Sequence, residues 1–341
     1  MTSEILAHVI RGETVESIHR GHISVIDGDG QAVMSVGDPS LVTFFRSAAK
    51  AFQFIPCITS GAVDAFGFTD EEIAIAVASH SGEPVHVEVA QRLLAKIGLD
   101  ETALRCGVHA PFYDRESRRL IAAGVKPTVF HNNCSGKHTA MLAFAKHIDA
   151  GIDDYDSTEN RIQNRILKCV SDFSGVPENE IAIGVDGCGV PSFALPLAGM
   201  ARSFANLVAP TAFHPTVQSA ANRVVSAMLK YPELIGGTER LDTILMQAAP
   251  GKIISKVGAE GVWLCGFLPS EKYPTGLGLA LKIEDGDDLY SRSVTAIEIM
   301  RHLGILSSDQ LTELSPMPIK NRRGQQVGRI EAAFDLSPNS G

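Results

Sequence analysis

The two ends of the chain carry strand-like patterns, and a long helical stretch separates them. Residues 15–38 alternate apolar and polar side chains around an Asp-Gly-Asp-Gly turn, which predicts a β-hairpin. Strand character returns at 253–269, 276–287 and 325–336, whereas apolar residues between about 70 and 205 recur at helical spacing. Because consecutive strands usually pair, this order predicts an α+β fold. Its N- and C-terminal strands would share one antiparallel sheet, packed with a large helical region.

Nothing in the sequence marks a boundary between independent domains. It contains no internal repeat, low-complexity linker or break in composition. We therefore expect a single domain over residues 1–341, with the sheet drawn from about 1–40 and 250–341 and the helical region from about 41–249.

Charge and cysteine content exclude several classes of function. The net charge of -9 offers no basic surface for nucleic acid, and no apolar window approaches the ~18 residues that cross a membrane. The N-terminus has no basic segment followed by an apolar one, so no export signal is expected. Six cysteines are too dilute for a disulfide framework in a chain of 341 residues. These features predict a soluble cytoplasmic protein with a small-molecule substrate.

The segment FFRSAAKAFQ, residues 44–53, places Ser47 three residues before Lys50 in apolar surroundings. On a helix these two side chains share a face, so the lysine amine can reach the serine hydroxyl. Serine needs a base to become a nucleophile, and a buried lysine can supply one because burial lowers its pKa. The pair is therefore a candidate nucleophile and base, although this spacing alone also occurs by chance.

Two further segments support a catalytic role for Ser47 and Lys50. VASHSGEP places Ser79 and Ser81 in a turn after a helical segment, and SKVGAEGVW places Lys256 at the entrance of an apolar strand. Serine penicillin-recognising enzymes combine Ser-x-x-Lys with a serine loop and a Lys-x-Gly strand in this order. The alternatives are that the serines cap the helix beginning near Pro84 and that Lys256 is a solvated strand residue.

A second cluster combines cysteines with basic residues. HNNCSGKHTAM contains Cys134 and Lys137 just before an apolar helix, and VDGCGVPSF places Cys188 between two glycines after Asp186. Such soft donors could form a zinc site, and buried inert thiols are the alternative. A phosphate-binding loop is excluded because its first glycine is missing. The other cysteines lie in apolar contexts that are typical of a core: Cys57, Cys106, Cys169 and Cys265.

Together, five segments resemble the thermolabile L-asparaginase II family, the rhizobial-type asparaginases: FFRSAAKAFQ, ASHSGEPVH, HNNCSGKHTAML, VDGCGVPSFALPL and SKVGAEGVW. The resemblance covers nearly the whole chain and shows no departure within these motifs. It implies hydrolysis of L-asparagine to L-aspartate and ammonia by a homodimer. It also implies a fold similar to serine β-lactamases and serine-dependent glutaminases.

Carried over by motif, the resemblance assigns roles to named residues. Ser47 would be the nucleophile, Lys50 its base, and Ser79 would form a second Ser–Lys pair with Lys256. Zinc would be bound by Cys134, Lys137 and Cys188. Asp186 could orient a bound water or the substrate amine. Arg46, His80 and Glu83 are further candidates for substrate binding on charge alone.

Two rival interpretations follow from the same residues. The first is another serine amidase, such as a glutaminase or a β-lactam hydrolase. The second, from a different class, is a non-catalytic zinc-binding protein that senses a small molecule, in which the Ser47 and Lys50 spacing is incidental.

Overall fold

The computed structural model describes residues 2–306, 310 and 314–334. These residues form two compact units, each of which is built from separate stretches of the chain. The sheet unit comprises the described residues of 1–48, 195–209 and 248–341, and the helical unit comprises 49–194 and 210–247.

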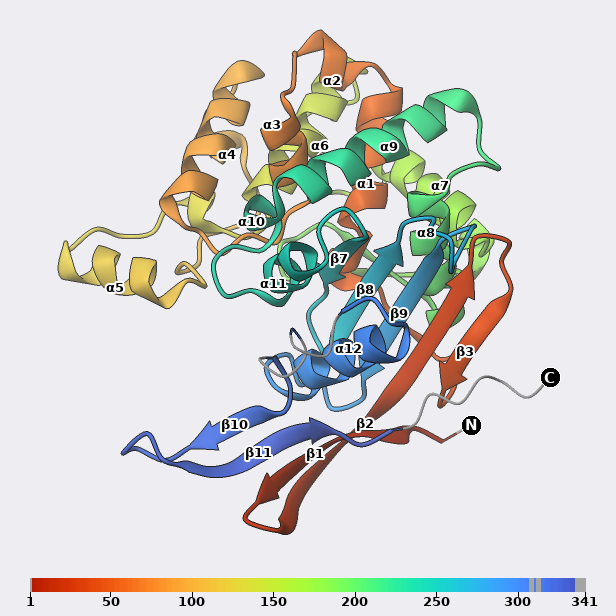
Figure 1. The fold of residues 1–341 in the computed structure, drawn as a ribbon. Coiled ribbons are helices and arrows are strands. Elements are labelled where there is room, and N and C mark those ends of the chain that lie inside the picture. Colours follow the sequence, from red (N-terminus) through yellow and green to blue (C-terminus); the bar gives the residue numbers. More distant parts are fainter. Residues whose placement is uncertain (1, 307–309, 311–313, 335–341) are drawn as a thin grey trace. The chain divides into compact units, whose positions relative to one another are not determined.

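The sheet unit contains an antiparallel sheet whose strand order is β10-β11-β1-β2-β9-β8-β7, with β3 also paired to β2 (Figure 1). The N-terminal strands therefore lie between the C-terminal ones, since β1 pairs with β11 and β2 with β9. The strands of this sheet are β1 (Glu4–Arg11), β2 (Thr14–Asp27), β3 (Ala32–Val36), β7 (Ile253–Val257), β8 (Val262–Phe267), β9 (Leu277–Ile283), β10 (Met317–Lys320) and β11 (Gln326–Ala332).

Two helices, α8 (Leu197–Val208) and α12 (Ser291–His302), pack on this sheet. The approach of α8 to β9 is close: a Cβ on Gly278 would lie 1.8 Å from the carbonyl oxygen of Ala201. Only glycine allows this backbone contact. The short strand β4 (Val42–Phe44) and the 3-10 helix η1 (Arg46–Ala49) follow the N-terminal strands.

The helical unit is built mainly of α-helices, with one antiparallel pair of short strands, β5 (Ala182–Val185) and β6 (Pro191–Pro196). Its longer helices are α1 (Lys50–Thr59), α3 (Asp70–Val77), α4 (Pro84–Lys96), α5 (Asp114–Ala122), α6 (Ser135–His147), α7 (Arg161–Ser174), α9 (Pro215–Lys230) and α11 (Leu241–Ala248). The shorter helices are α2 (Ala62–Ala65), α10 (Pro232–Ile235), η2 (Glu101–Ala103), η3 (Val129–His131) and η4 (Glu178–Glu180).

Helix α6 lies at the centre of the helical unit and is buried from Ser135 to Ala145. It packs against α1, α3, α4 and α7. A Cβ on Gly136 would lie 2.2 Å from the carbonyl oxygen of Ile75, so this glycine permits the close contact between α6 and α3. The glycine of the HNNCSGKHTAM segment therefore serves helix packing.

The α+β class and the antiparallel sheet shared by N- and C-terminal strands are confirmed. The hairpin predicted over 15–38 is also confirmed, as β2 pairs with β3. Strands β4, β5 and β6 lie in the range predicted to be helical and were not expected. Strands β1 and β10 lie in the ranges assigned to the sheet but were not identified as separate strands. Residues 335 and 336 of the predicted strand at 325–336 lie outside the described residues. The expected single domain stays a prediction.

Among the described residues, no helix combines the length and the apolar character needed to cross a lipid bilayer.

Candidate active site

Ser47 lies in η1, which runs directly into α1 at Lys50. Its side chain is partly exposed, whereas Ala48, Ala49 and Lys50 are buried. The preceding residue, Arg46, has φ 51, the left-handed region that non-glycine residues rarely adopt. Such backbone strain is found most often at functional sites, so it supports a functional role for this turn.

Lys50 is fully buried in the helical unit. Its amine donates hydrogen bonds to the carbonyl oxygens of Ala78 and Asn133, the latter at 3.2 Å, and to the Ser79 hydroxyl at 3.0 Å. Burial lowers the pKa of Lys50, while the Cys134 sulfur opposes this change and the nearby Lys137 ammonium adds to it. A lysine with a lowered pKa has access to the neutral form that a general base requires.

Ser79 and Ser81 do not cap helix α4. The N-cap is Glu83, Ser79 accepts a hydrogen bond from Lys50, and the Ser81 hydroxyl donates to the carbonyl of Gly236 at 2.8 Å. The capping alternative is therefore wrong. The structure instead places the Ser79 hydroxyl beside the Lys50 amine. The predicted pairing of Ser79 with Lys256 stays a prediction.

His80 is fully buried, and both ring nitrogens are hydrogen-bonded. The Gly82 N–H donates to Nδ1 at 3.2 Å, so Nε2 carries the proton and donates to the Ser135 hydroxyl at 3.0 Å. These bonds join the segment after α3 to the start of α6. His80 thus has a packing role, and its predicted contact with substrate stays a prediction.

Cys134, Lys137 and Cys188 come together in the helical unit. The Lys137 amine lies 3.0 Å from the Cys188 sulfur, and the two sulfurs are hydrogen-bonded to each other. This bond lowers the pKa of Cys134 well below its usual value and raises that of Cys188. Burial alone would lower the pKa of Lys137, but the sulfurs of Cys188 and Cys134 raise it.

The chemistry of this donor set fits zinc. Two sulfurs and an amine converge from the start of α6 and from the turn between β5 and β6. Asp186 lies in the same turn, and its negative charge also raises the pKa of Lys137. No group of three or more His, Cys, Asp or Glu side chains that could hold a metal ion is present in the described residues, so any site here depends on the lysine.

In the sheet unit, Lys256 occupies the fourth position of β7 and is buried. Its amine donates to the carbonyl of Val257 at 3.0 Å. The interpretation of Lys256 as a solvated strand residue is therefore wrong. Two residues later, a Cβ on Gly258 would lie 3.1 Å from the carbonyl oxygen of Phe45, so the end of β7 approaches the backbone just before Ser47.

Comparison with known families agrees with the motifs. The model of the L-asparaginase II family matches residues 7–332. The chain belongs to the L-asparaginase II family. This membership confirms the family resemblance seen in the five motifs and makes the chain an amidohydrolase with a serine–lysine type of site.

Two solved structures share low sequence identity with this member of the L-asparaginase II family. A Bacillus subtilis glutaminase in covalent complex with 5-oxo-L-norleucine is 15% identical, covering 86% of this chain and 88% of its own, with a TM-score of 0.41. A β-lactamase from Burkholderia ambifaria is 14% identical, covering 84% and 94% of the two chains, with a TM-score of 0.42. At these TM-scores the similarity decides neither the fold nor the reaction. No curated protein matches the sequence.

Sequence reasoning missed the groups that hold Lys50. They are the main-chain carbonyls of Ala78 and Asn133, which no side-chain pattern reveals. It did find the four cysteines expected in the core, since all of them are buried free thiols: Cys57, Cys106, Cys169 and Cys265.

Proposed function

We propose that the chain hydrolyses L-asparagine to L-aspartate and ammonia through an acyl-enzyme on Ser47. The observation that carries the proposal is the buried Lys50 amine, which lies 3.0 Å from the Ser79 hydroxyl and three residues after Ser47 in the sequence. Membership of the L-asparaginase II family supports the amide substrate.

In the proposed reaction, neutral Lys50 removes the proton of the Ser47 hydroxyl. The serine oxygen then forms a bond with the side-chain amide carbon of the substrate, and the carbonyl oxygen becomes an oxyanion. Main-chain N–H groups would stabilise this charge. As the C–N bond breaks, the proton held by Lys50 passes to the departing nitrogen, and ammonia leaves. A water molecule attacks the ester, returns a proton to Ser47, and releases aspartate.

Ser79 would carry protons in this scheme, since its hydroxyl lies 3.0 Å from the Lys50 amine. It would accept a hydrogen bond from protonated Lys50 and donate one to the lone pair of neutral Lys50. Lys256 would be the second lysine, as the family resemblance implies. Its positive charge would disfavour protonation of Lys50 and so keep the base neutral. Arg46 and Asp186 remain the proposed contacts for the charged groups of the substrate.

The test is ammonia release from asparagine, glutamine and a chromogenic β-lactam, measured for wild type, Ser47→Ala and Lys50→Met. Both substitutions should lower kcat by at least about a thousandfold. Ser60→Ala is the matched control, because Ser60 is a partly buried serine at the other end of α1. A folded Ser47→Ala variant with more than a few per cent of wild-type turnover contradicts the mechanism. Turnover of glutamine or lactam alone would move the substrate assignment to the rival amidase.

We also propose that Cys134, Lys137 and Cys188 hold zinc when the protein is loaded. Zinc would supply a fixed positive charge for binding the substrate, and Lys137 would have to lose its proton to become a ligand. Metal analysis of the purified protein should find close to one zinc per chain, and Cys134→Ser should lose it. Cys169→Ser is the control, because that thiol is buried elsewhere in the helical unit. Zinc retained by Cys134→Ser would refute the ligand set.

A homodimer in the cytoplasm is the proposed assembly and location. Sedimentation equilibrium should return twice the chain mass of 36.4 kDa. If the purified protein binds zinc and asparagine but releases no ammonia from any amide, the non-catalytic sensor replaces the enzyme.

A further inference from the structure

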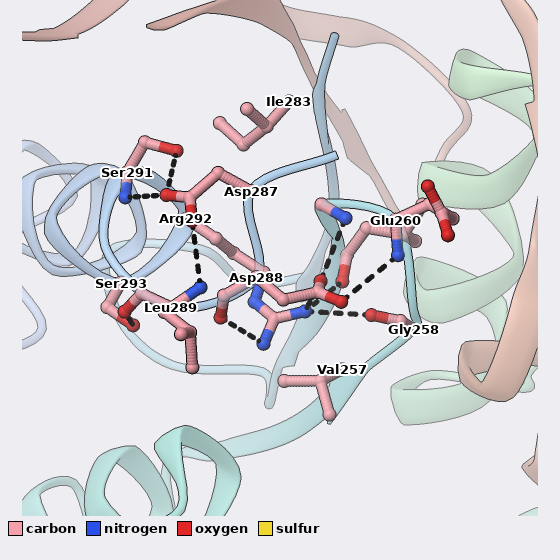
Figure 2. Close-up of polar contacts among 12 residues, drawn as sticks. Val257, Gly258, Glu260, Ile283, Asp287, Asp288, Leu289, Ser291, Arg292 and Ser293 are labelled. Atoms are coloured by element: carbon pink, nitrogen blue, oxygen red, sulfur yellow. Dashed lines mark hydrogen bonds and ion pairs between the residues drawn. The ribbon is translucent and has the colours of Figure 1, made fainter. Parts of the chain in front are cut away.

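One buried arginine on α12 holds the turn that follows Lys256. Figure 2 shows the Arg292 guanidinium among residues of the turn between β7 and β8 and of the segment before α12. Its Nη1 donates to the carbonyl oxygen of Gly258 at 2.8 Å and to that of Val262 at 3.4 Å. The side chain is only 7% exposed, so these are buried, charge-assisted hydrogen bonds.

Asp288 binds both Arg292 and the turn as a hydrogen-bond acceptor. Its carboxylate pairs with Nη1 of Arg292, and its main-chain oxygen accepts from Nη2 at 2.6 Å. The same carboxylate accepts the main-chain N–H groups of Glu260 at 3.2 Å and Gly261 at 2.8 Å (Figure 2). Arg292 thus donates hydrogen bonds to carbonyls of the turn, while Asp288 accepts hydrogen bonds from its N–H groups.

The turn needs such support because its backbone is unusual. Glu260 has φ 63, which a non-glycine residue adopts at a cost, and Gly261 follows with φ 70. Residues in these conformations persist only where surrounding contacts hold them. The Arg292 and Asp288 pair supplies those contacts directly.

The turn also touches the segment that leads to the proposed nucleophile. A Cβ on Gly258 would lie 3.1 Å from the Phe45 carbonyl, and the Gly258 carbonyl is one that Arg292 binds. A shift of this turn would therefore move the end of the strand that carries Lys256 and press on the backbone two residues before Ser47. Both consequences arise inside the sheet unit.

We propose that Arg292, held by Asp288, is a positioning residue for amide hydrolysis: it fixes Lys256 and the Ser47 segment in their reactive placement. This inference rests on the proposed function. Arg292 would not touch the substrate. Lysine cannot replace it, because its single ammonium lacks the second nitrogen, Nη2, that binds the Asp288 main-chain oxygen while Nη1 binds the turn carbonyls and the carboxylate.

The test compares Arg292→Lys with wild type in steady-state kinetics and in amide hydrogen exchange. Displacing reacting groups by a fraction of an ångström can cost up to about a hundredfold in rate, so we expect kcat to fall at least about tenfold. KM should stay within about twofold, since no substrate contact is lost. Exchange of the Glu260 and Gly261 amides should accelerate at least about tenfold, because local opening of the turn becomes easier.

Arg301→Lys is the matched control. Arg301 lies on the same helix and also pairs with an acidic residue, Glu298, but its side chain is 55% exposed. Its kinetics and the exchange of the turn should match wild type. Asp288→Asn is the second variant, to be used if Arg292→Lys does not fold, because its side chain is 39% exposed.

The outcomes separate this inference from the proposed function. If wild type is active, Ser47→Ala is inactive and Arg292→Lys retains wild-type kcat, the positioning role is wrong and the function stands. A fall in kcat that Arg301→Lys reproduces also overturns the role. If wild type hydrolyses no amide, the function fails, and unchanged exchange of the turn in Arg292→Lys would then refute the structural part as well.

Discussion

Acid should weaken the folded protein through His80. Its Nδ1 already accepts the Gly82 N–H, so a second proton on the ring would place two donors against each other. Burial lowers the pKa of His80 well below its usual value, and the stacked His86 ring, 5.1 Å away, adds to the effect. In the unfolded chain the imidazole is free to take a proton with a pKa of about 6.5.

The sign and size follow from proton linkage. Below about pH 6.5 the unfolded state binds a proton that folded His80 does not, so the free energy of unfolding falls as the pH is lowered. Between pH 7.5 and 5.5 one such group removes about 1.4 kcal/mol, provided that folded His80 stays neutral. Above about pH 7.5 the imidazole of His80 is almost wholly neutral in both states, so it no longer changes the free energy of unfolding with pH.

The perturbation is His80→Gln, which keeps one acceptor and one donor but cannot titrate. Urea unfolding of wild type and variant at pH 7.5 and 5.5 gives four free energies. Wild type should lose about 1.4 kcal/mol more than the variant over this interval. Equal losses in the two proteins, to within about 0.3 kcal/mol, would show that His80 does not resist protonation in the fold.

Two further substitutions test the packing of the helical unit. Gly136→Ala should lower the free energy of unfolding by about 2 kcal/mol or more in urea, because its Cβ would meet the Ile75 carbonyl at 2.2 Å and overpacking outweighs the gain in helix propensity; an unchanged midpoint would contradict the close packing. Glu72→Ala should lower the free energy of unfolding by about 2–3 kcal/mol in the same assay, because the fully buried Glu72 carboxylate pairs with Lys96 at 2.5 Å. Glu71→Ala, at an exposed position, should lower it by under about 1 kcal/mol. Similar losses for the two glutamates would refute this difference.

Secondary structure that depends on residues close together in the sequence could be predicted. The hairpin of β2 and β3 carries its turn residues with it, and the buried run at 253–269 contains β7 and β8. Strand β1 was missed because its register is interrupted twice against β2, which breaks the alternation of buried and exposed residues. Strand β5 has four residues, too few for a period to emerge.

Only those parts of the candidate site that consist of side chains could be predicted from the sequence. Ser79 was selected for its hydroxyl, and its contact with Lys50 joins residues 29 positions apart. The sequence could not show that main-chain carbonyls hold Lys50, or that Gly136 serves helix packing. Arg292 was also invisible, because its partners are carbonyls of a turn 30 and 34 residues away.

The pairing of β1 with β11 has a consequence for the newborn chain. Residues 4–11 emerge from the ribosome long before their partner strand β11, which ends at residue 332. Strand β2 must likewise wait for β9, while every residue of the helical unit has been synthesised by position 247. Because contacts so distant in sequence form slowly, the first strands expose unpaired edges throughout translation. The polypeptide therefore offers a long interval in which chaperones could bind its N-terminus.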